Sequence, residues 1–393
     1  MSLNETVIVY AGRTPIGKMN GAYAATPAPR LTAALIRDVQ ARTGLEGAEI
    51  DEIMVGNVLT SGIGQAPARQ AAIYGGLPES VCATTVGRVC GSGIKSVMLA
   101  DQAIRLGDSR MILAGGQENM TMAPHLLPGS RSGYRFGGFQ ARDSMQWDGL
   151  WDPYSDMAMG SCGEICAREY GFTREEQDQF AIESYRRARK AVESGVFAGE
   201  IVPVEVTNRR STKTIELDEE PFSVDLDRLT GLRPAFDKEG TVTAGNSSSI
   251  SDGAALLLLT DRPSAEAAGL KPLATIRAQA SFAHAPQMFT TAPVGCIRRL
   301  LDKAGMQAGD IDAWEINEAF AVVPMAAIRD LNLDHEKVNM FGGAVSLGHP
   351  IGASGARILV TLLNVMREKD LKTGLATLCI GGGEASGVIV ERA

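Results

Sequence analysis

Short apolar segments alternate with amphipathic segments along most of this chain. Each apolar segment has the length of one strand, and the segments between them place apolar residues at helical spacing. This alternation predicts an α/β fold in which helices pack on a sheet. In the first part of the chain we expect strands at residues 7–10, 52–58, 84–89 and 110–114, and helices at 31–42, 67–74 and 94–106.

The alternation returns in the last third of the chain. Strands are expected at 273–280, 313–316, 373–379 and 388–391, and helices at 294–305, 319–331 and 352–367. Cys90 follows Asp51 by 39 residues and His349 follows Asp312 by 37, and a Ser-Gly pair, a helix, a strand and a glycine cluster come after each. Matches in the same order predict a duplicated domain, with the functional site where the two halves meet.

The middle of the chain follows a different pattern. Residues 121–149 are rich in Gly, Pro, Ser, Arg and Met and weakly periodic, and so long a loop is usually functional. Residues 164–197 are helical, with a capping box at 173–176 opening the second part, a strand at 201–207 and an acidic irregular stretch to 233. We therefore expect an inserted loop domain at 121–245, a first half made of 1–120 plus 246–272, and a second half at 273–393.

Composition narrows the class of protein. The 393 residues are 45% hydrophobic and 21% charged, which is typical of a globular chain. A net charge of −8 without a basic run argues against a nucleic-acid partner, and the longest apolar run has strand length, so no membrane span is expected. The 44 glycines make up about 11% of the 393 residues, which exceeds the usual share of ~7%. Because they form neither a G-X-Y period nor a linker tract, we expect them at particular backbone positions.

The termini and cysteines predict a cytoplasmic protein. Residues 1–5 lead straight into an apolar run, which leaves no room for a leader, and the last three residues are not a peroxisomal signal. Six cysteines are too few for a disulfide scaffold, so free thiols are expected. Cys162 and Cys166 lack further ligands, and we expect them to pack inward from one helix face without a metal.

Cys90 is the first candidate for chemistry. It lies between a predicted strand and a predicted helix and is followed by Gly91-Ser92-Gly93. A helix N-terminus lowers the pKa of a thiol, and the glycines would let a substrate carbonyl approach closely. The alternative that Cys90 is an ordinary buried thiol stays open.

Three other residues lie at strand ends or in glycine-rich loops. His349, within the run 342–355, could act as the base toward a thiol, or could bond a backbone carbonyl. Cys379 precedes the glycines at 381–383, whose N–H groups could form an anion nest, and could itself carry a proton. Asn317 could orient a water or a carbonyl, or could be a helix N-cap.

These residues together resemble the thiolase family, of the acetyl-CoA acetyltransferase (3-ketoacyl-CoA thiolase) type, over essentially the whole chain. The matching motifs are Arg13-Thr14-Pro15-Ile16-Gly17, Val89-Cys90-Gly91-Ser92-Gly93, Gly115-Gly116-Gln117-Glu118-Asn119-Met120, Thr243-Ala244-Gly245-Asn246, Ser251-Asp252-Gly253-Ala254-Ala255, Asn317-Glu318-Ala319-Phe320, the run Gly342–Gly355 and Cys379-Ile380-Gly381-Gly382-Gly383.

The resemblance implies two βαβαβαββ halves stacked as a five-layer α/β/α/β/α fold, with a loop domain inserted in the first half for CoA binding and oligomer contacts. It implies a homo-oligomer, a tetramer or at least a dimer, and no metal. The implied reaction is reversible Claisen condensation and thiolysis between acetyl-CoA and 3-ketoacyl-CoA. Coenzyme A would be substrate and product, with no permanently bound cofactor.

The resemblance also implies a role for each candidate residue. Cys90 would accept the acyl group, and His349 would take the Cys90 proton. Cys379 would remove a proton from the α-carbon of the second acyl-CoA, or return one in thiolysis. His349 and a water held by Asn317 would form one oxyanion hole, and the N–H groups of Cys90 and Gly381 the other.

For the pantetheine arm of CoA, the resemblance implies contacts that are mostly apolar with one hydroxyl. They are Leu150, Met159, Phe236, Ala244, Ser248, Ala319 and Phe320. The chain departs from the family pattern in two places. Ala158 stands where many thiolases have His, which predicts a roomier acyl pocket, and an Arg often found near Pro221 is absent, with Arg228 as the replacement contact to a phosphate.

Three alternatives remain at the level of sequence. A decarboxylating ketoacyl synthase would use His/His or His/Asn beside the cysteine, where this chain offers Cys379. A non-catalytic acyl-CoA or lipid carrier would not need Cys90, His349 and Cys379 together. A Cys-His hydrolase would pass the acyl group to water rather than to CoA.

Overall fold

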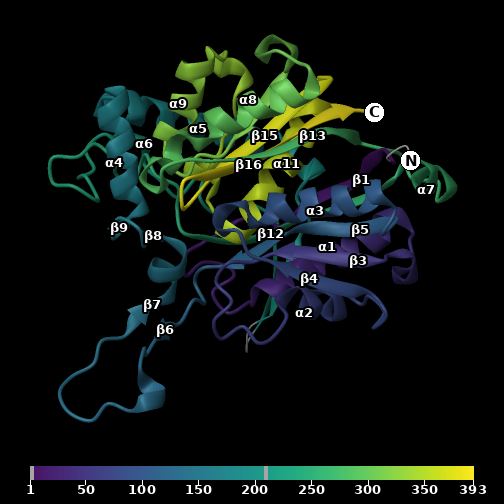
Figure 1. Cartoon of the computed structure of the whole chain (residues 1–393), viewed down its shortest axis with the longest axis horizontal. Coiled ribbons are helices and arrows are strands. Elements are labelled where there is room, and N and C mark those ends of the chain that lie inside the picture. The colour runs from purple at the N-terminus through teal and green to yellow at the C-terminus, as the bar shows by residue number, and fades with distance from the viewer. Residues whose placement is uncertain (1–3, 208–210) are drawn as a thin grey trace.

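The computed structural model describes residues 4–207 and 211–393. At its centre lies helix α11 (Ile351–Glu368), buried along most of its length, with α3 (Ser92–Leu106) packed against it. Helix α11 contacts strands of both halves of the chain, and Figure 1 shows strands above and below this helical layer. Buried residues lie on every side of α11, which is typical of a helix in the centre of a core.

One long sheet provides the strands on both sides, in the order β14-β15-β16-β13-β1-β12-β5-β3-β4, and β2 pairs with β12. Pairing of Val7 with Thr275 and of Ile8 with Ala274 joins the two wings of the sheet. The strands are β1 (Thr6–Arg13), β2 (Gly17–Lys18), β3 (Glu52–Gly56), β4 (Cys82–Val86), β5 (Met111–Asn119), β12 (Ser251–Asp261), β13 (Ala274–Ala283), β14 (Ala313–Ile316), β15 (Thr373–Ile380) and β16 (Glu384–Arg392).

Two further helical layers cover the outer faces of the wings. Helices α1 (Ala28–Thr43) and α2 (Pro67–Tyr74) pack on the wing of β12, β5, β3 and β4. Helix α8 (Ala292–Ala304) packs on β13, β15 and β16, and α9 (Val322–Leu331) packs on α8. The layers therefore run helix, sheet, helix, sheet, helix, and the predicted five-layer fold is confirmed (Figure 1).

The two wings repeat one another in detail. The Asp51 carboxylate accepts hydrogen bonds from the backbone N–H groups of residues 110–111, at 2.7 and 2.9 Å. The Asp312 carboxylate does the same for residues 372–373, at 3.1 and 3.0 Å. The repeated Ile-Asp pair in the sequence thus anchors the start of the neighbouring parallel strand in each half.

The central helices α3 and α11 touch through their backbones. A Cβ atom at Gly93 would lie 2.9 Å from the backbone nitrogen of Ala356, and one at Gly355 would lie 2.5 Å from that of Ile94. Neither position could hold a side chain without moving a helix. The predicted close approach of substrate to the glycines beside Cys90 is therefore wrong for Gly93, since the protein's own backbone occupies that space.

Several predicted boundaries differ from the structure. Gly115 and Gly116 were expected to end a strand but lie within β5, because both pair with residues of β12 and β3. A Cβ at Gly116 would lie 2.1 Å from the Gly352 carbonyl oxygen, so this strand position requires glycine. The strand expected at 84–89 ends at Val86, since the chain must turn before Cys90. The helix expected from 319 begins at Val322, after a loop that lines the cavity described below.

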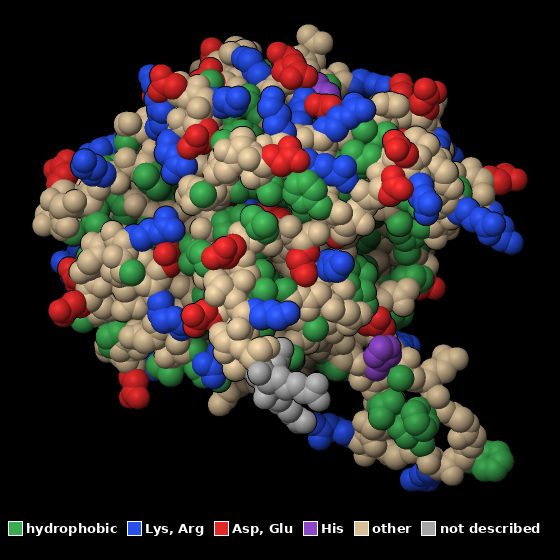
Figure 2. Space-filling model, turned by 180° about the vertical axis from the view of Figure 1, so that it is seen from behind, with side chains coloured by type: hydrophobic (Ala, Val, Ile, Leu, Met, Phe, Trp, Pro, Cys, Tyr) green, Lys and Arg blue, Asp and Glu red, His purple; other side chains and the backbone are tan. Residues whose placement is uncertain are grey.

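Residues 121–245 carry small elements around two long helices. These are β6 (His125–Leu126), β7 (Arg142–Asp143), β8 (Trp151–Asp152), β9 (Met157–Ala158), α4 (Met159–Tyr170), α5 (Arg174–Glu193), β10 (Val204–Thr207), β11 (Thr212–Ile215) and α6 (Leu226–Leu229); the short helices α7 (Arg262–Ala267) and α10 (Ala344–Leu347) lie outside this region. The segment around β6 and β7 projects from the body as a lobe with exposed hydrophobic side chains (Figures 1 and 2). No helix of the described ranges is long and apolar enough to cross a membrane.

A buried ion-pair cluster fastens this region to the first strand. Arg13, at the end of β1, is fully buried and pairs with Glu200 at 2.5 Å and with Asp218 at 2.7 Å. Removing one partner from such a cluster leaves an uncompensated buried charge, which costs several kcal/mol, about 3–5. The Arg-Thr-Pro motif near the N-terminus thus has a structural role.

Candidate active site

Cys90 lies in a strained turn at the entrance of α3. The preceding residue, Val89, has φ of +43°, a left-handed conformation that is rare for a β-branched side chain. The Ser92 hydroxyl holds the turn, because it accepts from the Arg88 N–H at 2.7 Å and donates to the Val89 carbonyl at 2.7 Å. Such strain persists where the surrounding structure enforces it, typically at functional sites.

The environment of the Cys90 thiol differs from the sequence-based expectation. Burial raises its pKa to about 11, although the backbone N–H groups of Gly381 and of Cys90 itself donate toward the sulfur and oppose the shift. The predicted lowering of the pKa by the helix N-terminus is therefore wrong in its net direction. The two N–H groups predicted for one oxyanion hole do converge on the sulfur.

His349 presents a free ring nitrogen. Its Nδ1 lies 2.6 Å from the Ser354 hydroxyl, which donates its own proton to the Pro350 carbonyl at 2.9 Å. The hydroxyl must then accept from Nδ1–H, so Nε2 carries the lone pair. Nε2 is buried and has no partner in the described part of the chain. Burial, helped by the charge of Arg357, lowers the pKa of His349 to about 3, so the imidazole is neutral at pH 7.

Cys379 lies at the end of β15 and is fully buried. Burial raises the pKa of its thiol well above the ordinary value, and the nearby Cys90 raises it further. The next residues turn sharply, with φ of +92° at Gly382 and +85° at Gly383. The structure thus brings the two cysteines from different halves close enough for Cys90 to influence the ionisation of Cys379.

Asn317 directly follows β14, a strand of the second half of the chain. Its backbone N–H donates to the Thr377 carbonyl at 3.1 Å, which fixes it beside β15. Its Oδ1 accepts from Arg357 at 3.4 Å, and its Nδ2 is buried without a hydrogen-bond partner among the described residues. The alternative of a helix N-cap is not observed, since α9 begins only at Val322 and Ala321 precedes it.

A cavity of about 750 Å³ opens in front of Cys90 and His349. Its lining is mainly apolar, and Ala158 and Arg228 also contribute to it. All seven residues expected to contact pantetheine lie in its wall: Leu150, Met159, Phe236, Ala244, Ser248, Ala319 and Phe320. Cys379, Asn317 and Gly381 are not among the residues that form that wall. Among residues 4–207 and 211–393, no cluster of three His, Cys, Asp or Glu side chains could hold a metal ion.

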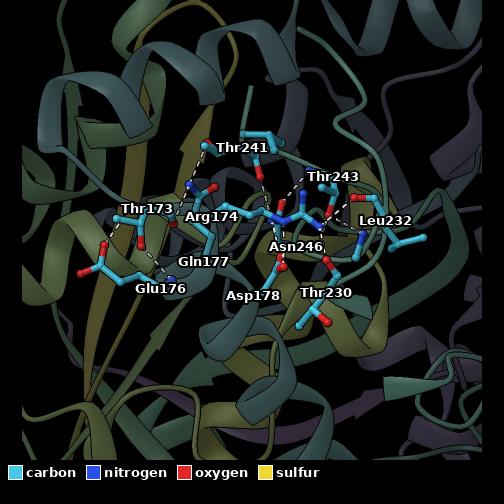
Figure 3. A network of polar contacts seen from close by, with 12 residues as sticks. Thr173, Arg174, Glu176, Gln177, Asp178, Thr230, Leu232, Thr241, Thr243 and Asn246 are labelled. Atoms are coloured by element: carbon cyan, nitrogen blue, oxygen red, sulfur yellow. Dashed lines mark hydrogen bonds and ion pairs between the residues drawn. The ribbon is translucent and has the colours of Figure 1, made fainter. Parts of the chain in front are cut away.

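A polar network that the sequence analysis missed holds one side of this cavity (Figure 3). From α5, Arg174 pairs with Asp178 and donates to the carbonyls of Thr230 and Leu232, at 3.1 and 2.8 Å. Asp178 accepts from the Asn246 amide at 2.9 Å. These contacts fix both ends of the segment that carries Phe236 and Ala244. In the sequence, the capping box at the N-terminus of α5 was the one feature that indicated where this helix begins.

Comparison with known proteins places this arrangement in a family. The family model described as "Thiolase, N-terminal domain" matches residues 6–263, and "Thiolase, C-terminal domain" matches 270–392. The chain belongs to the thiolase family. Acetyl-CoA acetyltransferases of Pseudomonas aeruginosa and Escherichia coli are 49% and 50% identical to this thiolase over 392 residues, covering 99% of this chain and 100% of theirs.

A solved structure agrees with the sequence comparison. The crystal structure of the Bacillus anthracis acetyl-CoA acetyltransferase superposes on this thiolase with a TM-score of 0.98, at 38% identity, over 100% of both chains. The resemblance stated from the motifs is therefore confirmed at the level of family and fold.

The protonated state of Cys90 gives a testable pH dependence for the thiolase. Because its pKa lies near 11, the thiolate fraction should rise about tenfold per pH unit from pH 7 to 10, and the rate of iodoacetamide inactivation should rise with it. The measurement uses the Cys82→Ser variant, which removes the exposed thiol. An inactivation rate that levels off below about pH 10 would show that Cys90 ionises at an ordinary or lowered pKa.

Proposed function

We propose that Cys90, His349 and Cys379 carry out reversible Claisen condensation and thiolysis between acetyl-CoA and 3-ketoacyl-CoA. The observation that supports this is a buried thiol and a neutral imidazole with a free Nε2, both lining one cavity, with a second thiol close behind. Condensation without decarboxylation needs a base for a carbon-bound proton. Cys379 offers one, so a ketoacyl synthase, a carrier or a hydrolase is not favoured.

In the acylation step, His349 Nε2 takes the proton of the Cys90 thiol, and the sulfur attacks the thioester carbonyl of acetyl-CoA. The N–H groups of Cys90 and Gly381 stabilise the resulting oxyanion. When the carbon–sulfur bond to CoA breaks, the CoA thiolate takes the proton of Cys379. Cys90 then holds the acetyl group, His349 is protonated and Cys379 is a thiolate.

In the condensation step, the Cys379 thiolate removes an α-proton from a second acetyl-CoA. Burial raises the pKa of Cys379, so its thiolate is a strong base for this purpose. His349 and a water held by Asn317 stabilise the enolate oxygen. The enolate carbon attacks the acetyl carbonyl on Cys90, the bond to sulfur breaks, and His349 returns its proton to Cys90.

Coenzyme A serves as substrate and product, with no cofactor bound permanently. The apolar wall of the cavity suits the pantetheine arm, and the Ser248 hydroxyl offers it a polar contact. Arg228, on α6, is highly exposed and pairs with Asp225 at 3.3 Å, so its guanidinium is accessible to a CoA phosphate.

The acyl-chain preference follows from Ala158, which lines the cavity in place of a larger imidazole. We expect the wild type to cleave 3-ketoacyl-CoA chains longer than acetoacetyl-CoA, and Ala158→His to lower the rate on the longer chains by about tenfold or more relative to acetoacetyl-CoA. CoA-dependent cleavage rates across a chain-length panel check this. Ala158→Leu separates the effect of volume from that of polarity. An unchanged preference in Ala158→His would contradict the assignment.

We also infer that the protein forms a homo-oligomer and lies in the cytoplasm. The projecting lobe exposes Leu127, Tyr134, Phe136 and Phe139, and such a patch is typical of an interface, which supports a homo-oligomer, a tetramer or a dimer. All six cysteines are free, which suits a reducing cytoplasm. The division into 1–120 plus 246–272, 121–245 and 273–393 stays a prediction.

A further inference from the structure

A buried cation lies behind the proposed oxyanion site and has no part in the reaction as written above. Arg357, on α11, is 1% exposed, and its Nη1 is 3.6 Å from the Glu315 carboxylate of β14, which is equally buried. Neither Nε nor Nη1 of Arg357 has a hydrogen-bond partner within the described ranges. The carboxylates of Glu315, Glu200 and Glu318 offset part of the cost of burying this charge, but in the described ranges the guanidinium donates a hydrogen bond to none of them.

The one side-chain hydrogen bond that Arg357 makes within the described ranges goes to Asn317. Its Nη2 donates to Asn317 Oδ1 at 3.4 Å. A guanidinium has donors but no acceptor, so the atom of the amide that faces it must be the oxygen. The NH₂ group of Asn317 is thereby turned the other way. Its nitrogen is the buried, unpartnered donor of this side chain in the described structure.

The same cation lies close to the rest of the site. Its charge contributes to the lowered pKa of His349, which places it within electrostatic range of the imidazole. The residues that follow Asn317 in the chain, Ala319 and Phe320, line the cavity. Positive charge therefore lies behind the region where the proposed reaction develops negative charge on oxygen.

We propose that Arg357, steadied by Glu315, is a positioning residue that turns the Asn317 amide so that its NH₂ group serves the reacting oxygen. The proposal rests on the function proposed above, since it requires Asn317 to act in the reaction. It predicts that the effect of Arg357 on turnover passes through Asn317.

The test compares four variants in condensation of acetyl-CoA. Arg357→Gln can accept as well as donate, so it no longer dictates the amide orientation, and kcat should fall about 10- to 100-fold with less than about threefold change in KM. Arg357→Lys keeps a donor without an acceptor and should recover part of the loss. Asn317→Ala should lose as much as Arg357→Gln or more. Arg105→Met, which removes a guanidinium from α3, should leave kcat unchanged.

The deciding measurement is the double variant. Adding Arg357→Gln to Asn317→Ala should cost less than about threefold further, because the group being positioned is already gone. Losses that multiply, or equal losses in Arg357→Lys and Arg357→Gln, would show a general structural role and overturn the proposal. An active Asn317→Ala would overturn it as well. Wild-type protein that fails to condense acetyl-CoA would instead refute the proposed function itself. Should Arg357→Gln not fold, the Arg357→Lys cycle with Asn317→Ala applies the same criterion.

Discussion

Replacing Cys90 by serine is expected to lower the condensation of two acetyl-CoA molecules, without malonyl-CoA, by at least about 10³-fold. A hydroxyl is far less acidic than a thiol, so His349 cannot generate a comparable nucleophile from it. The fold should persist, because the N–H groups of Cys90 and Gly381 that face the sulfur can donate to the serine oxygen instead. Thermal unfolding checks this second expectation.

The matched control for the Cys90 variant is Cys296→Ser. Cys296 is also buried, and its thiol donates to the Ala280 carbonyl at 3.5 Å, a bond that a serine hydroxyl can replace. This control should keep its activity. Retention of a tenth or more of the wild-type rate in Cys90→Ser would mean that another group accepts the acyl chain.

Replacing Cys379 by serine is expected to separate the two halves of the reaction. Exchange of the α-protons of acetyl-CoA with deuterium from solvent should fall by about 10²-fold or more, since the base for the carbon-bound proton is gone. Acetylation of Cys90 should continue at a reduced rate and can be followed by mass spectrometry of the intact protein. Both measurements use the same preparation, so a general loss of folding would be seen as a loss of acetylation.

Two results would count against the role of Cys379. Normal α-proton exchange in Cys379→Ser would assign the base to another residue. Loss of acetylation together with exchange, in a protein that unfolds at the wild-type temperature, would show that Cys379 is indispensable for protonating the leaving CoA in the first step and would leave its role as the base of the second step without support. The fully buried Cys162, on α4, provides the control substitution to serine.

Local pattern predicted much of this molecule. Strand and helix periods fixed the element order, and the spacing of Asp51, Cys90, Asp312 and His349 indicated the duplication. These signals lie within short segments of the sequence. The boundary errors arose where a contact with a distant part of the chain decides the conformation, as at Gly116, which stays in the strand because it pairs with Ala255 of β12 and Gly56 of β3.

The electrostatics of the site could not be predicted in the same way. The helix N-terminus beside Cys90 is a local feature, but the burial that outweighs it depends on how residues from both halves close over the thiol. The contact of Arg357 with Asn317 joins residues 40 positions apart on a helix and a strand end. No motif around Arg357 distinguishes it from an ordinary polar residue of an amphipathic helix.

The close approach of α3 and α11 at Gly93 and Gly355 has a consequence for how this protein can change over evolutionary time. Side chains in a core can be exchanged in compensating pairs, and elements then shift slightly to accommodate them. Here the backbones of α3 and α11 meet without side chains between them, so this contact holds Cys90, just before α3, in place relative to His349, just before α11. The surrounding core can diverge while the interval between nucleophile and base stays the same.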